Sequence, residues 1–319
     1  MIAVHKPYAA TLHTHQTPSE KLQNTIYIPF TLTIMYEKIK ETAAWLQAHT
    51  SQKPQTAIIL GTGLGRLAEE IEVTDAFNYA DIPNFPVSTV EGHSGRLLFG
   101  HLGTTPVLAM QGRFHYYEGY DMKTVTFPIR VMYELGIKTL FVSNAAGGMN
   151  PDFHIGDIML IRDHINLFPE HPLRGKNFPT GPRFPDMSEA YDRALLARAH
   201  DIALRHGIKV HEGVYVGVSG PTFETPAEYR MYRILGGDAV GMSTVPEVIV
   251  AHHCGIRAFG VSIITDIGVE GSIVKVSHEE VQKAANAVQP VLADIMRDMI
   301  SDAEYPPPPR QLSTSNPIL

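Results

Sequence analysis

Short apolar runs alternate with amphipathic stretches along most of the chain. The apolar runs predict strands at residues 56–60, 97–102, 106–110, 138–143, 156–161, 209–218, 238–241 and 256–264. Helical periodicity predicts helices at residues 36–49, 121–135, 189–206, 226–236, 245–253 and 278–300. Near-continuous apolar strands that alternate with helices are typical of a sheet covered on both faces. We therefore expect an α/β fold, a single domain with a central mixed, mostly parallel β-sheet flanked by helices.

The two ends of the chain lack this periodicity. Residues 1–34 are rich in Thr, His, Pro and Gln, and their charged residues and histidines interrupt any candidate signal-peptide core. The helical pattern begins near Met35, so we expect Met35 to be the natural start. Residues 1–34 are then disordered or an over-called upstream extension. The domain spans residues 35–302, and residues 303–319 form a flexible Pro-rich tail.

Composition is that of a globular protein with a sizeable core. The chain has 319 residues, of which 44% are hydrophobic and 18% charged. Its formal net charge of −7 argues against a nucleic acid as the main partner. No stretch approaches the roughly 20 apolar residues that span a bilayer, so we expect no membrane partner. The single cysteine, Cys254, excludes an internal disulfide and lies in an apolar run, where a packed core residue is expected.

A glycine-rich loop follows the predicted strand at 56–60. Its sequence, GTGLG at residues 61–65, stands between that strand and a helix-compatible run. A strand, a glycine loop and a helix start together point backbone N–H groups at an anion. A lone glycine loop is equally consistent with a tight turn, so this loop indicates an anion site only if other anion-binding residues recur.

Such residues follow other predicted strands, where ligand sites of parallel sheets lie. Arg113 and His115 are two apart and share a face of an extended segment. The planar guanidinium of Arg113 suits phosphate oxygens. Further candidate donors are Thr62, His93 and Ser243. An arginine alone could serve a surface ion pair, and a lone histidine is more often a packing residue, but their convergence favours a phosphate or sulfate site.

A second group of residues suggests a subsite for a flat heterocycle. Phe223 can stack on a ring, and Glu224 can accept from ring N–H groups. Taken singly, Phe223 suits core packing and Glu224 suits the N-terminus of the next helix. Asp266 follows the last predicted strand, and buried carboxylates are rare unless paired.

Several other chemistries lack support in the sequence. His252 and His253 are adjacent and point to different faces of a helix, and neither a His-Glu-x-x-His pattern nor paired cysteines occur, so we expect no metal site. No Gly-Lys-Ser/Thr pattern follows the first glycine loop, which argues against an NTPase. A dinucleotide site would need a further glycine where Arg66 stands, and a Gly-x-Ser-x-Gly element of serine hydrolases does not occur.

The motifs together closely resemble the trimeric purine nucleoside phosphorylases. The resemblance covers about residues 36–300 and rests on GTGLG at 61–65, GHSGRL at 92–97, QGRFHYYEGY at 111–120, NAAGG at 144–148, GPTFET at 220–225 and GMSTVPE at 241–247. It implies phosphorolysis of purine (deoxy)ribonucleosides, mainly inosine and guanosine, to free base and (deoxy)ribose 1-phosphate in purine salvage. It also implies a cytoplasmic homotrimer with inorganic phosphate as co-substrate and with no cofactor.

The resemblance also implies roles for individual residues. The phosphate site is expected to contain Thr62, His93, Arg113, His115, Ala145 and Ser243. The sugar site is expected to contain Tyr117, Met242 and His278, and the purine site Tyr215, Phe223, Glu224, Thr265 and Asp266. Catalytic roles fall to His115, Glu224 and Asp266. Positioning and preorganised electrostatics supply most of the expected catalysis, because charge develops on both the sugar and the departing base.

Two departures from the family pattern bear on these roles. Many members specific for 6-oxopurines have Asn where this chain has Asp266, whereas Glu224 suits the N1–H of hypoxanthine or guanine. We therefore expect inosine and guanosine as main substrates, with adenosine activity in addition. The loop at 166–173 is shorter than its family counterpart, and Phe168 is the candidate to complete a neighbouring subunit's sugar site or, equally, to pack locally.

Other functions remain open at this stage. A methylthioadenosine or adenosine phosphorylase is the nearest alternative, although Glu224 argues against the former. A catalytically inactive nucleoside-binding protein would not need to keep a phosphate site. A dinucleotide-binding regulator rests only on the glycine loop.

Overall fold

The computed structural model describes residues 18–61, 65–89 and 94–301, and of residues 18–33 it describes only the helical backbone. The strands are β1 (Thr56–Leu60), β2 (Glu72–Asn78), β3 (Arg96–Leu102), β4 (Thr105–Gln111), β5 (Thr139–Gly148), β6 (Ile158–Asn166), β7 (Val210–Gly217), β8 (Ala239–Gly241) and β9 (Arg257–Ile267). The α-helices are α1 (Pro18–His49), α2 (Gly65–Glu69), α3 (Met122–Val125), α4 (Phe127–Glu134), α5 (Arg193–Arg205), α6 (Pro226–Ile234), α7 (Val245–His253) and α8 (His278–Ser301). Short 3₁₀ turns lie at Tyr79–Asp81 and Tyr116–Glu118.

The strands form one mixed sheet in the order β2-β3-β4-β1-β5-β8-β7-β6-β9. β1 runs parallel to both β4 and β5, while β2, β3 and β4 are joined in antiparallel pairs. β9 pairs with β6 and also returns to β5, so the second half of the sheet closes on itself. The expected central mixed sheet is confirmed, and its closed half brings β5, β7, β8 and β9 around one region.

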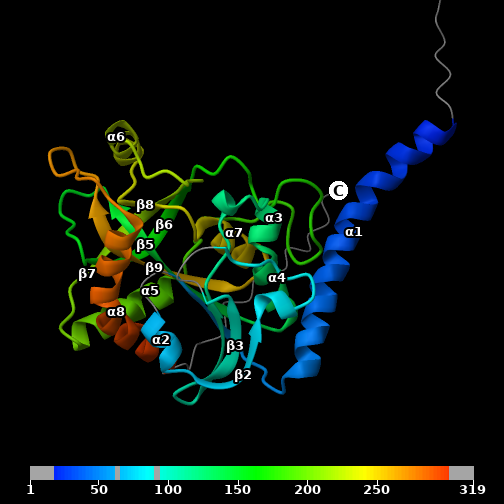
Figure 1. Cartoon of the computed structure of the whole chain (residues 1–319), viewed down its shortest axis with the longest axis horizontal. Coiled ribbons are helices and arrows are strands. Elements are labelled where there is room, and N and C mark those ends of the chain that lie inside the picture. The colour runs from blue at the N-terminus through cyan, green and yellow to red at the C-terminus, as the bar shows by residue number, and fades with distance from the viewer. Residues whose placement is uncertain (1–17, 62–64, 90–93, 302–319) are drawn as a thin grey trace, which may run out of the picture.

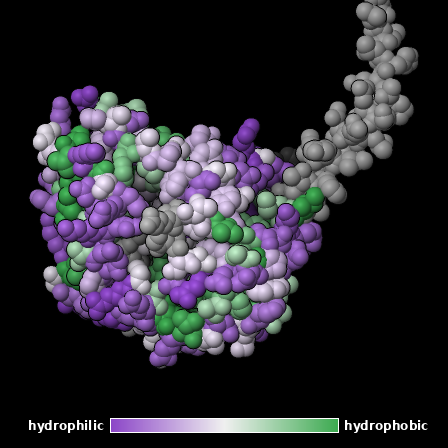
Figure 2. Space-filling view, in the orientation of Figure 1, coloured by the Kyte–Doolittle hydropathy of each residue, from purple (hydrophilic) through white to green (hydrophobic). Residues whose placement is uncertain are grey.

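Two groups of helices flank the sheet (Figure 1). In one group, α8 packs against α2, α5 and β9. In the other group, α1 packs against α4, and α4 packs against α7. All five residues of β1 are buried, as expected for a central strand covered on both faces. On the face seen in Figure 2, hydrophilic side chains are widespread and hydrophobic ones form small separate groups. The apolar residues of the predicted strands therefore form the interior.

β2 was not predicted from the sequence. Its residues are mostly exposed, and it pairs only with β3 at the edge of the sheet. Polar and charged residues such as Glu72 and Asp75 interrupt any apolar run there. An edge strand with one wet face carries no continuous hydrophobic signal, and charges there also discourage pairing with other chains.

β5 and β9 run further than their apolar runs predict. β5 continues through Asn144 to Gly148, and β9 continues through Thr265 and Asp266. Residues that we expected beyond the strand ends therefore lie within two paired parallel strands. The hydrogen bonds between β5 and β9 satisfy the backbone groups of these residues, with one irregularity between Ala146 and Gly147. Their polar side chains are therefore held on rigid backbone.

The predicted helix at 121–135 is two helices, α3 and α4, that meet at Thr126. Pro128 stands in the first turn of α4, where its missing N–H costs nothing. The helix predicted from residue 189 begins at Arg193, because Asp192 caps it by accepting a hydrogen bond from the Leu195 N–H.

α1 begins at Pro18 rather than near Met35, so the helix is longer than its amphipathic part. Proline is well accepted in a first helical turn. Ile39, Ala43 and Leu46 are buried in the core, whereas the N-terminal turns project away from the rest of the molecule (Figure 1). That residues 1–34 lie outside the functional domain stays a prediction, and the tail at 303–319 lies outside the described residues. No helix in the described part of the chain is long and apolar enough to cross a membrane.

Candidate active site

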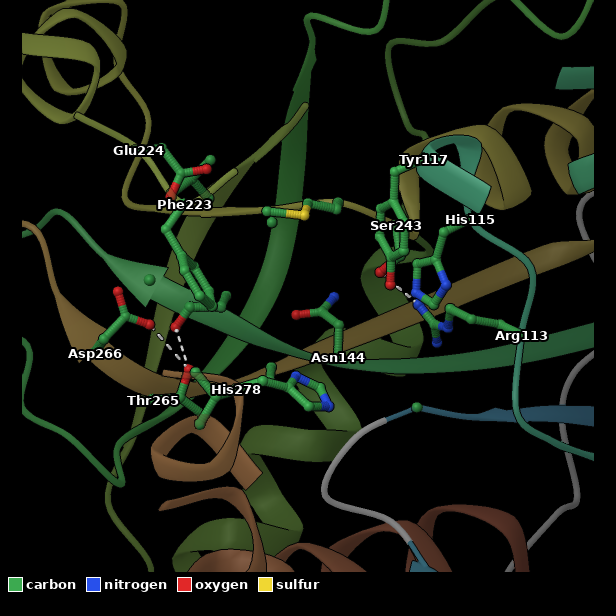
Figure 3. Close-up of a pocket in the computed structure, with 18 residues that line it drawn as sticks. Arg113, His115, Tyr117, Asn144, Phe223, Glu224, Ser243, Thr265, Asp266 and His278 are labelled. Atoms are coloured by element: carbon green, nitrogen blue, oxygen red, sulfur yellow. Dashed lines mark hydrogen bonds between the residues drawn. The ribbon is translucent and has the colours of Figure 1, made fainter. Parts of the chain in front are cut away.

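One cavity gathers most of the predicted site residues (Figure 3). It encloses about 690 Å³ of empty space, counting open solvent at its mouth. Its walls come from β5, β8 and β9, from the segments after β4 and β7, and from the start of α8. Arg113 and Ser243 lie at one end, and Glu224 and Asp266 at the other.

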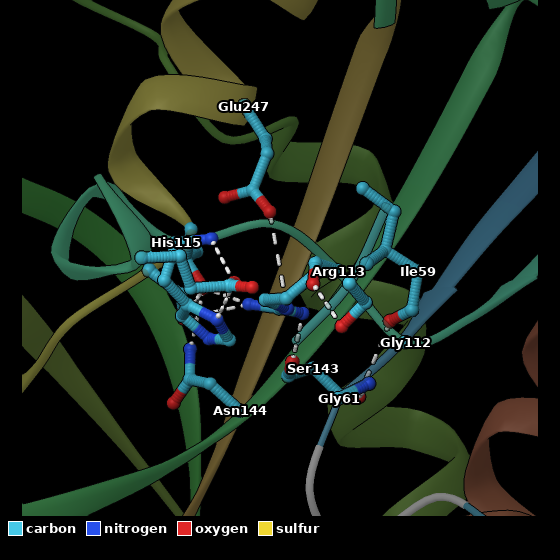
Figure 4. A network of polar contacts seen from close by, with 12 residues as sticks. Ile59, Gly61, Gly112, Arg113, His115, Ser143, Asn144 and Glu247 are labelled. Atoms are coloured by element: carbon cyan, nitrogen blue, oxygen red, sulfur yellow. Dashed lines mark hydrogen bonds and ion pairs between the residues drawn. The ribbon is translucent and has the colours of Figure 1, made fainter. Parts of the chain in front are cut away.

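Arg113 is the fixed cation of the first end. Its side chain is 2% exposed, and its Nη1 donates to Ser243 Oγ at 2.6 Å and to Thr244 Oγ1 at 3.1 Å. Its Nη2 donates to the carbonyl oxygen of Ser143. Buried Glu247 lies 3.8 Å from Nε and balances the charge (Figure 4). These contacts hold the guanidinium in one orientation before any ligand arrives.

Ser243 and Thr244 form a tight turn beside this arginine. Thr244 has φ 71° and ψ −54°, and the Val245 N–H donates to the Ser243 carbonyl oxygen at 2.7 Å. This is a γ-turn with the central residue in a strained conformation. Asn144 Nδ2 donates to Thr244 Oγ1 at 2.8 Å, which helps to hold the strain. Strained backbone of this kind gathers at functional sites, because the surrounding structure must maintain it.

His115 is fixed by Glu118, which sequence reasoning did not single out. Glu118 Oε1 lies 3.1 Å from His115 Nδ1 and accepts from the His115 backbone N–H at 2.7 Å. Burial alone raises the pKa of Glu118, but hydrogen bonds from His115 and Thr89 outweigh it and lower this pKa to about 2. An ionised Glu118 keeps the proton on Nδ1 and leaves Nε2 for a ligand. Burial lowers the pKa of His115, so the ring is neutral near pH 7.

Of the glycine loop at residues 61–65, the structure describes Gly61 and Gly65, and Gly61 lies at the cavity. A side chain at Gly61 would place Cβ 2.2 Å from the Ser143 carbonyl oxygen, so only glycine fits between β1 and β5. Gly61 lines the cavity, as does Ala145. Thr62 and His93, both expected at the phosphate site, lie outside the described residues.

The opposite end of the cavity is acidic. Asp266 is buried, and burial raises its pKa while hydrogen bonds from Tyr229 and Thr265 oppose the rise. Burial raises the pKa of Glu224 to about 7, and the charge of Asp266 adds to the increase. Phe223, 41% exposed, lines the same end. Two carboxyl groups and an aromatic ring thus face one space, as a heterocycle with N–H groups requires.

The three predicted sugar residues lie between the two ends. Tyr117, Met242 and His278 all line the cavity. The Tyr117 ring stacks on His115 with centroids 4.7 Å apart. His278 begins α8 and contacts Gln282 Nε2 at 2.9 Å through its Nε2.

Tyr215 does not take its predicted position, whereas Phe168 makes the local contacts of one of its two alternatives. Tyr215 is fully buried and does not line the cavity; its hydroxyl accepts from the Ser243 N–H at 3.4 Å, which makes it a support for the turn. Phe168 packs within its own chain, with its ring 6.4 Å from that of Tyr116 and beside Gly217. These contacts fit the local packing alternative, and the role of Phe168 in a neighbouring subunit's sugar site stays a prediction.

Sequence reasoning missed the acidic supports of the cationic end. Glu118 stands three residues after His115, the spacing of a capping box, and Glu247 stands in the first turn of α7. Both positions also suit ordinary helix-end charges, so the sequence alone does not mark them. Among the described residues, no cluster of His, Cys, Asp and Glu is arranged to hold a metal ion. Cys254 is buried, as expected.

Comparison with known proteins assigns the chain to a family. Residues 55–301 match a family model described as the phosphorylase superfamily. The purine nucleoside phosphorylase of Rattus norvegicus is 50% identical over 284 residues, which cover 86% of this chain and 97% of the rat protein. The chain belongs to the purine nucleoside phosphorylases. As a member of that family it is a pentosyltransferase.

Solved structures of purine nucleoside phosphorylases share the fold. A Schistosoma enzyme in complex with hypoxanthine is 44% identical, with a TM-score of 0.80, over 84% of this chain and 98% of the other. The Schistosoma mansoni enzyme in complex with adenosine is also 44% identical, with a TM-score of 0.80, over 85% of this chain and 98% of the other. The resemblance inferred from the motifs is confirmed.

Proposed function

We propose that the cavity binds phosphate at its Arg113 end and a purine at its Glu224 end, and that it cleaves inosine and guanosine as main substrates. This proposal rests on one observation, the opposite charges at the two ends of a single cavity. A fixed cation with hydroxyl donors suits a phosphate, and carboxyl groups beside Phe223 suit the N–H groups of a base. In the proposed phosphate site, Arg113, His115, Ala145 and Ser243 are joined by Thr62 and His93.

The proposed reaction follows from a phosphate site and a base site at opposite ends of one cavity. The C1′–N9 bond of the nucleoside breaks, and its electron pair leaves with the purine. A phosphate oxygen then forms a bond to C1′, which gives ribose 1-phosphate or its deoxy form. The phosphate anion stabilises the positive charge that develops on the sugar. A proton delivered from Asp266 to N7 would neutralise the departing base, and the raised pKa of Asp266 supports that role.

Base preference depends on the two carboxyl groups. An ionised Glu224 accepts from the N1–H of hypoxanthine or guanine, and a protonated Asp266 donates to N7 or O6. An ionised Asp266 instead accepts from a 6-amino group, so we propose adenosine as a further substrate. Schistosoma relatives bound to hypoxanthine and to adenosine are in keeping with both. Methylthioadenosine phosphorylase and nucleoside binding without turnover remain the alternatives.

We propose a cytoplasmic homotrimer that needs inorganic phosphate and no cofactor, acting in purine salvage. Phe184 is 86% exposed and lines a surface hollow with His164, His171 and Met187. A large exposed aromatic beside a hollow is typical of a contact surface. Sedimentation equilibrium should give about three times the mass of one chain; a monomer at assay concentrations would contradict this part of the proposal.

The deciding experiment offers inosine, guanosine, adenosine and methylthioadenosine to the purified protein, each with and without phosphate. Release of free base is followed. We expect phosphate-dependent cleavage of inosine and guanosine, with slower cleavage of adenosine. Asp266→Asn should lower adenosine cleavage relative to inosine, because Asn cannot be an anionic acceptor. Preference for methylthioadenosine would support the first alternative, and nucleoside binding without base release would support the second.

A further inference from the structure

Tyr229 stands directly behind the acidic end of the cavity. It lies on α6 and is 4% exposed, and its hydroxyl donates to Asp266 Oδ2 at 2.8 Å. It lines a neighbouring surface hollow rather than the cavity itself. A purine in the cavity would therefore meet Asp266 and not Tyr229, so any effect of Tyr229 on the base passes through the carboxyl group.

Two glycines make room for this contact. At Gly268 a Cβ would lie 2.1 Å from Cδ1 of Tyr229, inside its ring. At Gly147 a Cβ would lie 2.9 Å from Asp266 Oδ2 and 3.1 Å from the Tyr229 hydroxyl. Contacts shorter than about 3 Å force neighbouring atoms to move. The tyrosine reaches Asp266 only because both positions lack side chains.

Protein donors reach both oxygens of Asp266. Tyr229 donates to Oδ2, and Thr265 Oγ1 donates to Oδ1 at 3.1 Å. The groups that face Asp266 are Tyr229 from α6, Thr265 from β9 and Glu224 from the segment before α6. Tyr229 also lowers the pKa of Glu224 through a hydrogen bond, and the charge of Glu228 raises it. The tyrosine hydroxyl has a single proton, and its 2.8 Å contact gives that proton to Asp266. Hydrogen bonds donated to a carboxyl group favour its ionised form. Like charges in one site resist joint ionisation, so a proton leaving Asp266 favours protonation of Glu224.

The two arrangements of a single shared proton suit different bases. With the proton on Glu224, Glu224 donates to N1 of a 6-aminopurine and Asp266 accepts from the amino group. With the proton on Asp266, Glu224 accepts from N1–H of a 6-oxopurine and Asp266 donates to N7 or O6. The net charge is the same in both, so hydrogen bonds from the surrounding protein decide between them.

We propose that Tyr229 is a specificity-determining, positioning residue, which holds Asp266 as an acceptor and so widens the base site to 6-aminopurines. This inference rests on the proposed function of the same cavity. Tyr229 does not touch substrate; it acts through Asp266. Its hydroxyl increases the efficiency of adenosine cleavage relative to inosine cleavage, and Gly147 and Gly268 are the parts of the fold that permit it.

The test compares Tyr229→Phe with the wild type and with Tyr232→Phe. Tyr229→Phe keeps the ring against Gly268 and removes only the hydroxyl. Tyr232→Phe removes the hydroxyl of another tyrosine of the same helix, one that does not line the cavity. The readout is the ratio of kcat/KM for adenosine to kcat/KM for inosine. A hydrogen bond to a charged group is worth about a factor of ten or more in an equilibrium, so Tyr229→Phe should lower the ratio about tenfold and Tyr232→Phe should leave it unchanged.

Binding of free bases gives a second readout that needs no turnover. Calorimetric titration of adenine and hypoxanthine, each in the presence of phosphate, should show that Tyr229→Phe weakens adenine binding relative to hypoxanthine. An equal ratio in all three proteins overturns the inference, as does a wild type that neither cleaves adenosine nor binds adenine. A wild type that binds both bases but cleaves no nucleoside refutes the proposed function instead, and the binding ratio still tests Tyr229.

Discussion

At the scale of single residues, the cavity separates two kinds of electrostatic control. Arg113 is held in one orientation by its contacts with Glu247, Ser143 and Ser243. Glu224, by contrast, has a pKa raised to about 7 by burial and by Asp266. The arginine end is therefore fixed by geometry, whereas the carboxyl end changes its hydrogen-bonding pattern near neutral pH.

This difference predicts how activity depends on pH. Both proposed arrangements keep one proton on the pair of Glu224 and Asp266, and with Asp266 ionised this proton leaves Glu224 as pH rises through about 7. The ratio of kcat/KM for inosine to that for adenosine should therefore stay constant between about pH 6 and 8, because both substrates need the same proton and the same phosphate. Adenine binding, measured by calorimetry, should weaken above about pH 7 by up to about tenfold per pH unit, and Glu224→Gln should flatten this dependence. A wild-type ratio that changes steeply with pH would contradict the shared proton.

Arg113→Lys should weaken phosphate use while sparing the base end. Lysine keeps the charge but loses the planar fork that contacts Ser243, Thr244 and Ser143. We expect the KM for phosphate to rise about tenfold or more, with little change in hypoxanthine binding measured by calorimetry. Arg130→Lys is the matched control, because Arg130 is also buried but stacks on Phe178 outside the cavity lining. An unchanged phosphate KM in Arg113→Lys would argue against this end as the phosphate site.

At the scale of elements, the start of α6 carries much of the proposed base site. Thr225 and Glu228 form a capping box, and Pro226 stands in the first turn. Glu224 precedes this cap directly, and Tyr229 follows it within the next turn. The cap therefore fixes the positions of a proposed base-binding carboxyl group and of the residue that supports Asp266.

Thr225→Ala should loosen this arrangement. Loss of an N-cap side chain costs about 1 kcal/mol of stability, measurable by urea unfolding. Asp121→Ala removes the cap of α3, which accepts from the Thr124 N–H at 2.8 Å, away from the cavity lining. Both variants should lose similar stability, but only Thr225→Ala should raise the KM for inosine. Equal KM values in the two variants would show that the cap does not position Glu224.

The sequence predicted elements well where burial is continuous and poorly where it is not. β1, buried along its whole length, was predicted with its observed bounds. The charged edge strand β2 was missed, and the polar ends of β5 and β9 were taken as segments beyond the strands. For the site, the sequence motifs predicted more than the hydrophobic periodicity did, since most of the predicted residues line one cavity. Two tyrosines show what the sequence did not predict. Tyr215 lies behind the cavity lining, and Tyr229 contacts Asp266 from outside the cavity. Neither position follows from the spacing of residues along the chain.

At the scale of the whole molecule, closure of the sheet explains why distant segments meet. β5 pairs with both β8 and β9, so Asn144, Ser243 and Asp266 come together although about 120 residues separate the first from the last. Asn144 and Asp266 are thereby held on strands rather than on long loops. α1 stands apart from this arrangement, since only its C-terminal part packs on the body (Figure 1).

Removal of residues 1–34 should therefore leave folding and activity intact. Among the side chains of α1 that the structure describes, Ile39, Thr42, Ala43 and Leu46 are buried in the core. We expect the shortened chain to unfold within about 2 °C of the full chain, since no described core contact is lost, and to keep its kcat/KM for inosine. Leu46→Ala in the full chain should cost about 2–5 kcal/mol, because a fully buried leucine leaves a cavity. A shortened chain that unfolds several degrees earlier would place residues 1–34 inside the domain.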